Sequence, residues 1–163
     1  ITNLHYLGTL AHEFRHSYDN QKWSIGFPLI YILPQALSIF SIFSLLTIWF
    51  SVYWLLCLLF LLCLAPIPSP GRKLIELNGY IMSLFIANEI LKDEFYDVNV
   101  RREKLLKTVT QYNNNFTGPD YYYMWPAGVT KSLEEKVEKI LSGKIIEEDV
   151  IYEHMIAALN KTK

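Results

Sequence analysis

Residues 27–65 read FPLIYILPQALSIFSIFSLLTIWFSVYWLLCLLFLLCLA, and this stretch decides the fold because it carries no charged side chain. The uncharged block extends from Trp23 to Gly71, so all 15 basic and 16 acidic residues lie on either side of it. The chain therefore combines a hydrophobic insert with a polar domain. The alternative, a buried hairpin of a soluble protein, is disfavoured because the block is much longer than core helices normally need.

The length of the block indicates how often it crosses a membrane. As one straight helix, residues 27–65 would measure about 58 Å at ~1.5 Å per residue, nearly twice the ~30 Å core of a bilayer. We therefore expect two transmembrane helices, at 27–45 and 49–65, joined by a tight turn at 46–48. The cluster of prolines and glycine at 66–71 closes the insert.

Composition excludes several other classes of function. The formal net charge is -1, and the sequence shows neither a basic stripe nor a glycine-rich phosphate loop, so we expect no nucleic-acid or nucleotide partner. Both cysteines, Cys57 and Cys63, fall inside the apolar block, where we interpret them as small apolar side chains and not as a disulfide or metal pair.

An HExxH motif, formed by His12, Glu13 and His16, precedes the block on a segment that predicts a helix over residues 4–19. Histidines four residues apart share one helix face and can bind one Zn²⁺, and the glutamate between them can accept a proton from water at that metal. The alternative is a helix with two surface histidines and a solvated glutamate.

A catalytic zinc needs a third protein ligand, and the acidic residues after the block are the best candidates. Glu76 lies eleven residues after Ala65, as His16 lies eleven before Phe27, so a hairpin formed by residues 27–65 would bring both to the same height. Glu89, in the pattern Glu89-Ile-Leu-Lys-Asp93, would lie about 20 Å farther along a helix. We favour Glu76, and Tyr80, one turn later, is a candidate for stabilising the transition state, with plain packing as its alternative.

The segments AHEFRHSYD (11–19) and RKLIELNGY (72–80) together resemble small zincin-like peptidases of bacteria and phages, which pair an HExxH helix with a later helix of the form E-x-x-[AG]-Y. The resemblance covers about twenty residues. It implies Zn²⁺ on His12, His16 and Glu76, with Glu13 as general base. Such folds usually place a small sheet before the HExxH helix, so we expect a substrate-binding edge strand to lie outside this sequence.

A second resemblance is to the site-2 proteases, which combine a membrane HExxH motif with a proline-rich stretch and an Asp-Gly. The segment APIPSPGRKLIELNGY (65–80) is similar, although no aspartate stands at the expected place. The HExxH helix contains Arg15, Asp19 and Lys22, which makes it too polar to lie in lipid. We therefore expect an active site beside the bilayer core and not inside it.

These observations predict a mainly α-helical, zincin-like metallopeptidase domain interrupted by a two-helix transmembrane hairpin. Residues 1–24 would carry the HExxH helix, 25–66 the hairpin, and 67–163 the third ligand and the remaining helices. The expected function is hydrolysis of a peptide or protein substrate at a membrane. The alternatives are a site-2-protease-like intramembrane peptidase and a non-catalytic membrane interaction protein with a structural zinc site.

The polar part after the insert is expected to be mostly helical. Helical spacing predicts a helix over residues 73–99, which residues 101–110 extend, and a loop follows at 111–120. The aromatic run at 121–125 is either a belt at the membrane interface or a wall of the substrate groove. Ser132 and Glu135 have the form of a capping box, Gly143 would end that helix, and a last helix is expected over 147–159.

The hairpin leads to a prediction of topology, since both of its ends must lie on one side of the membrane. Lys22 before it and Arg72 and Lys73 after it indicate the cytoplasmic side by the positive-inside rule, and we expect a bacterial inner membrane. Cysteines introduced at Ser24 and at Ser69 should therefore both resist labelling from outside intact cells. Labelling of one position only would contradict the hairpin.

Overall fold

The computed structural model describes residues 2–33, 35–65, 70–118 and 128–162. Every regular element in these ranges is an α-helix or a 3₁₀-helix, which confirms the mainly α-helical class. In chain order the elements are α1 (Thr2–Trp23), α2 (Gly26–Ile32), η1 (Gln35–Ile48), η2 (Val52–Leu64), α3 (Pro70–Glu94), α4 (Val98–Thr117), α5 (Val129–Leu141), η4 (Lys144–Glu148) and α6 (Ile151–Thr162).

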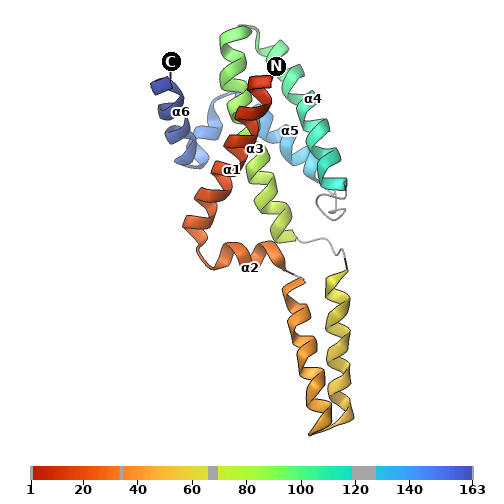
Figure 1. Ribbon diagram of the computed structural model, residues 1–163. Helices are drawn as coiled ribbons and strands as arrows, with labels where there is room; N and C mark the ends of the chain where they lie inside the picture. Colours follow the sequence, from red (N-terminus) through yellow and green to blue (C-terminus); the bar gives the residue numbers. More distant parts are fainter. Residues whose placement is uncertain (1, 34, 66–69, 119–127, 163) are drawn as a thin grey trace.

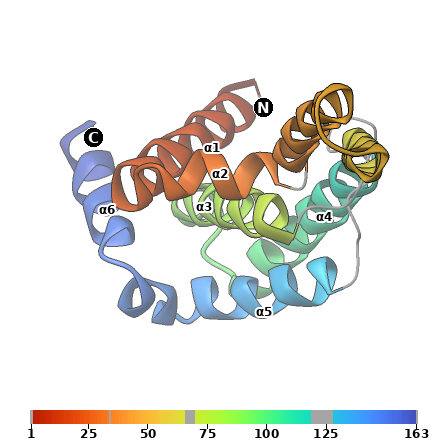
Figure 2. The same ribbon diagram turned by 90° about the horizontal axis from the view of Figure 1, so that it is seen from below.

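Helix α3 is the centre of the helical body. It packs against α1, α2, α4 and α5, and every residue from Gly79 to Ile86 is buried (Figures 1 and 2). By length and composition α3 is also long and apolar enough to cross a membrane. In this fold its apolar side chains instead form the core, because polar or amphipathic helices cover it on several sides.

Helices α4 and α5 cover one side of α3. In α5, Val129, Leu133, Val137 and Ile140 are buried at spacings of three and four residues, which gives the helix a single apolar face. Their partners in the core include Leu105, Val109 and Phe116 of α4, which are at most 1% exposed. This packing fixes α4 against α3, beside the cluster described below.

Helix α1 is held by a buried polar network as well as by apolar contacts. Asp19, which is 1% exposed, accepts hydrogen bonds from Arg15 Nε at 3.0 Å and from Asn78 Nδ2 of α3 at 3.4 Å. Arg15 also pairs with Asp149 at 3.1 Å. Removing one partner from such a network would leave a buried charge uncompensated, so these contacts specify how α1 lies on α3.

The apolar block forms a helical hairpin that projects from the body, with η1 and η2 side by side (Figure 1). No residue of η1 or η2 is buried. The expected boundaries need correction: the turn lies at 49–51 and not at 46–48, and Phe27 belongs to α2, which is bent by 81° from η1. Pro34 follows α2, and a proline disfavours helix in the residue before it, which explains the early break.

Four other expectations about the polar part are wrong. The helix expected over 73–99 ends at Glu94, and residues 101–110 belong to the separate helix α4 instead of extending α3. Residues 111–117 continue α4 and do not form a loop, because Tyr112 and Phe116 pack on Tyr80 of α3 and outweigh the low helix propensity of the three asparagines. Helix α5 begins after Gly128, so Ser132 lies inside it and caps nothing. Residues 144–148 form the separate element η4, so that the last helix starts at Ile151.

Two remaining expectations have different outcomes. Gly143 follows α5 with a φ of 78°, in the left-handed region that favours glycine, as its predicted role in ending the helix requires. The aromatic run at 121–125 lies outside the described residues.

Candidate metal centre and its surroundings

The structure brings His12, His16 and Glu76 together, with one potential ligand atom from each within 4.8 Å of the others. The two histidines come from consecutive turns of α1, and the glutamate comes from the facing turn of α3. His12 Nε2 lies 2.9 Å from His16 Nε2 and 3.2 Å from Glu76 Oε2, while His16 Nε2 lies 3.5 Å from the same carboxylate oxygen. Three donor atoms therefore converge on one point.

These separations suit a small divalent cation. Ligand atoms held tetrahedrally at about 2.0–2.2 Å from zinc lie ~3.3–3.5 Å from one another. The two distances to Glu76 Oε2 are close to this separation, and the distance of 2.9 Å between the histidine nitrogens is shorter. Two imidazoles and one carboxylate are also a donor set that catalytic zinc sites use, with the fourth position left for water or substrate. His12, His16 and Glu76 could thus hold a divalent metal ion, and their donor set is one that zinc uses.

The Glu76 carboxylate is held in its charged form by the groups around it. Its side chain is 3% exposed, and burial alone would raise its pKa. Hydrogen bonds involving His12, His16 and Tyr31 outweigh that effect and hold the pKa well below its usual range. A charged carboxylate is the form that binds a metal.

Tyr31 of α2 orients this carboxylate from the hairpin side. Its hydroxyl donates to Glu76 Oε1 at 2.8 Å, leaving Oε2 toward the histidines. Burial and the charge of Glu76 raise the pKa of Tyr31 to about 12, so the hydroxyl keeps its proton at neutral pH. The guanidinium of Arg72 lies 4.7 Å from the centre of the Tyr31 ring. The ring of Phe27, one turn before Tyr31, lies edge-on to the His16 ring, with 6.2 Å between the two ring centres.

Gly79 makes room for the His12 imidazole. A Cβ atom at position 79 would come within 2.6–2.8 Å of three atoms of that ring, closer than real Cβ atoms approach other atoms. The absence of a side chain therefore lets the ring lie directly against the backbone of α3. In this chain the contact gives a physical reason for a glycine, and not an alanine, three positions after Glu76.

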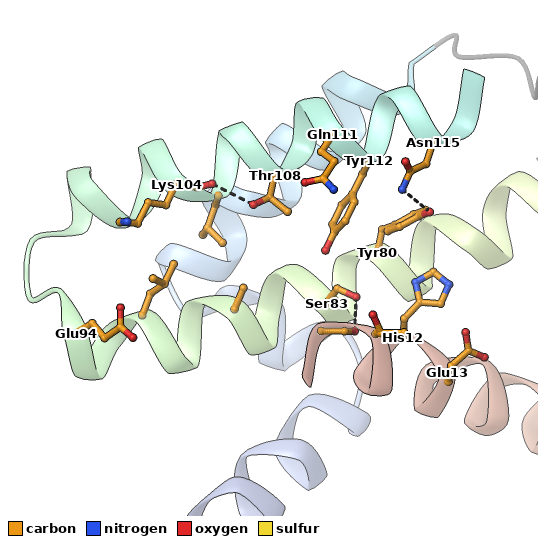
Figure 3. A pocket seen from close by; sticks show the side chains of 15 residues that line it. His12, Glu13, Tyr80, Ser83, Glu94, Lys104, Thr108, Gln111, Tyr112 and Asn115 are labelled. Atoms are coloured by element: carbon orange, nitrogen blue, oxygen red, sulfur yellow. Dashed lines mark hydrogen bonds between the residues drawn. The ribbon is translucent and has the colours of Figure 1, made fainter. Parts of the chain in front are cut away.

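Tyr80 lies beside the cluster, with its ring 4.8 Å from that of His12. Its hydroxyl accepts a hydrogen bond from Asn115 Nδ2 of α4 at 3.2 Å, and its ring also packs on Tyr112 (Figure 3). The two readings of Tyr80, packing and transition-state stabilisation, are compatible, because the ring is packed while the hydroxyl is held at a defined position. Sequence reasoning missed Asn115, which lies in the segment that had been interpreted as a loop.

Glu13 is exposed and lines two cavities that meet at His12. One cavity, of about 530 Å³, runs between α3 and α4; the other, of about 400 Å³, lies over the cluster and is also lined by Tyr31 and Arg72. A glutamate that faces open space beside the two histidines is accessible to water and to a substrate. This position suits a general base.

The alternative third ligand lies elsewhere. Glu89 bonds to Lys92 at 2.6 Å and accepts from Asn88 at 3.3 Å, and it is not part of the three-residue cluster. His154 is exposed on α6. The described residues thus bring Glu76, and not Glu89, to the HExxH histidines.

We predict that Glu76→Ala loses bound zinc under mild chelation, whereas Glu89→Ala retains it. Loss of a ligand should lower metal affinity by more than the ~10–100-fold that residues behind the ligands contribute. Zinc content after dialysis against a weak chelator, with helix content measured in parallel, would test this. Zinc retained by Glu76→Ala and lost by Glu89→Ala would move the site to the Glu89 pattern.

We further predict that Gly79→Ala weakens zinc binding and that Gly8→Ala does not. Both glycines lie within helices at the α1–α3 contact, so both substitutions gain about 1 kcal/mol of helix propensity. A Cβ at Gly8 would meet Ser83 at an ordinary 3.9 Å, whereas at Gly79 it would displace the His12 ring. Titration of each variant with zinc would compare them, and equal affinities would contradict a role for Gly79.

Comparison with models of protein families, with curated protein sequences and with solved structures finds no match for this chain. The function proposed below therefore depends on the chemistry of the cluster and its surroundings.

Proposed function

We propose that the protein is a zinc-dependent peptidase that its apolar hairpin anchors in a membrane. The observation that carries this proposal is the convergence of His12, His16 and Glu76 beside an accessible Glu13. A purely structural metal site would have no need of an additional carboxylate facing the open side.

Each residue of the cluster has a defined part in the proposed reaction. His12, His16 and Glu76 would hold the ion, and Tyr31 would orient the carboxylate. Bound zinc lowers the pKa of a water molecule to about 7 and polarises a carbonyl group. Glu13 would accept the proton from the attacking water and deliver it to the amine that leaves as the peptide bond breaks. The Tyr80 hydroxyl, held by Asn115, would donate a hydrogen bond to the oxyanion.

The surface of the hairpin supports the membrane anchor. Its large apolar side chains face outward, with Leu56, Leu59 and Leu62 each more than 60% exposed. Exposed apolar surface of this extent is typical of contact with lipid or a partner protein. At ~2.0 Å per residue, η1 and η2 would be about 28 and 26 Å long, close to the ~30 Å bilayer core.

The two ends of the hairpin differ in their side chains, as expected for a hairpin that is inserted in a membrane. Trp49, Phe50 and Tyr53 gather at the tip and are 74–78% exposed, and aromatic side chains are typical of the membrane interface. The other end leads into the helical body with its basic residues, which favours a cytoplasmic active site in a bacterial inner membrane. The cluster belongs to this body, which supports a site beside the bilayer over a site-2-protease-like site within it.

The decisive test separates metal binding from catalysis. Glu13→Gln should keep bound zinc and lower kcat about 10²–10⁴-fold, because the amide cannot accept a proton. His16→Ala should lose both zinc and activity, while Glu103→Gln, an exposed acid on α4, should change neither. The measurements are zinc content and hydrolysis of casein and of a peptide library by the purified protein in detergent. Near-normal turnover by Glu13→Gln would refute the peptidase mechanism, and an inactive parent chain that binds zinc would indicate a structural metal site.

A further inference from the structure

The larger cavity is a groove that begins at His12 and Glu13 and continues between α3 and α4 as far as Glu94 and Lys104 (Figure 3). Its volume of about 530 Å³ lies within the range of ~300–1,000 Å³ that is typical of ligand sites. Because the groove opens onto the candidate metal centre, a molecule lying in it would reach the reactive side chains.

The groove is lined by both apolar and polar side chains, a combination that suits a polypeptide ligand. Ala87 and the half-buried ring of Tyr112 provide apolar surface, whereas Thr108 and Gln111 of α4 provide polar groups along one edge. An extended peptide presents apolar side chains and backbone donors and acceptors together, and both need partners when they leave water. A purely apolar ligand would leave the polar edge without a role.

The length of the groove indicates how much of a substrate it accepts. Tyr80 and Glu94 both line it and are separated by fourteen residues of α3, or about 21 Å at ~1.5 Å per residue. An extended chain rises ~3.3 Å per residue, so the groove would hold about six residues.

The orientation of the groove indicates where the substrate comes from. In Figure 1, α3 begins on the side of the hairpin and extends away from it. The groove is lined by α3 residues from Tyr80 to Glu94, so it runs along α3 in the same direction, away from the hairpin. Glu76 lies six residues after Pro70, or about 9 Å along the helix at ~1.5 Å per residue. The smaller cavity, lined by Tyr31 and Arg72, opens the cluster on the hairpin side. A chain that emerges from the bilayer beside the hairpin would meet the metal centre first and the groove second.

We propose that this groove binds an extended segment of a membrane-anchored polypeptide, which the enzyme cleaves close to its anchor. The inference rests on the proposed peptidase function and adds the class of substrate and its direction. The bond at the metal centre would lie about three residues beyond the level of Pro70, where α3 begins, since an extended chain covers ~10 Å in that length. Sharing a membrane also raises the effective concentration of such a substrate without new contacts.

The test uses a matched pair of threonines on α4. Thr108 lines the groove and Thr110 does not, yet each donates its hydroxyl to the backbone carbonyl four residues earlier, at 3.2 and 3.3 Å. Thr108→Trp should fill the groove, while Thr110→Trp costs the same local hydrogen bond and leaves the groove open. Gln111→Trp, at an exposed groove position, provides a second blocking variant should Thr108→Trp fail to fold.

Binding is measured with Glu13→Gln as the background, so that it does not depend on cleavage. The protein and a synthetic peptide, made of an apolar transmembrane anchor and a polar tail of mixed sequence, are reconstituted in phosphatidylcholine–phosphatidylglycerol vesicles. We expect Thr108→Trp to weaken binding at least about tenfold, because a filled subsite loses its contacts, and Thr110→Trp to bind like the background. The same tail without an anchor should bind at least about tenfold more weakly. Cleavage of the anchored peptide by the zinc-loaded parent chain is measured in parallel.

Each outcome bears on one of the two proposals. Equal binding by the two threonine variants, or no binding to the background protein, would overturn the groove as the substrate site. Equal binding of anchored and free tails would overturn the membrane-anchored source. Groove-dependent binding without cleavage by the parent chain would support the groove and overturn the peptidase function.

Discussion

A carboxylate that folding removes from water needs compensating partners, and most of the candidate site follows from how this chain supplies them to Glu76. Two partners, His12 and His16, come from α1, and the third, Tyr31, comes from α2. Their approach depends on close packing of α1 on α3, which Gly79 permits and the network around Asp19 maintains. The same arrangement that stabilises a buried anion therefore assembles a donor set for a cation.

The central part of the site could be predicted from sequence because its information is local. Two histidines four residues apart share a helix face whatever the tertiary structure, and the apolar block determines which later acid returns to the same height. Tyr31 and Asn115 could not be found in this way. Tyr31 lies in a stretch without charge that reads as membrane, and Asn115 lies in a run of asparagines whose low helix propensity favours a loop. Their positions depend on packing between elements far apart in the chain.

The fold shows the same division between local pattern and tertiary packing. Two features can be recognised from nearby residues alone. The spacing of apolar residues identifies α3 as a helix, and a glycine at position 143, which adopts a positive φ, identifies the end of α5. The continuation of α4 through 111–117 depends instead on Phe116, which is fully buried against Tyr80. The start of α5 similarly depends on burial of Val129 in the core and not on the side-chain cap that the sequence offers at Ser132. Burying a large apolar side chain contributes about 1.5–3 kcal/mol, which exceeds the propensity of one or two unfavourable residues.

Helix α2 connects the hairpin to the candidate metal centre and is also part of that centre. It occupies the seven residues between the turn after α1 and the break before η1, and it places Phe27 against His16 and Tyr31 against Glu76. Because α2 is bent by 81° from η1, the helix lies across the hairpin end of the body instead of continuing the hairpin (Figures 1 and 2). The position of the hairpin therefore constrains the orientation of the Glu76 carboxylate. Under the proposed function, the membrane interface that positions α2 would also position Glu76, so that the hairpin and the cluster of His12, His16 and Glu76 would act as one structural unit.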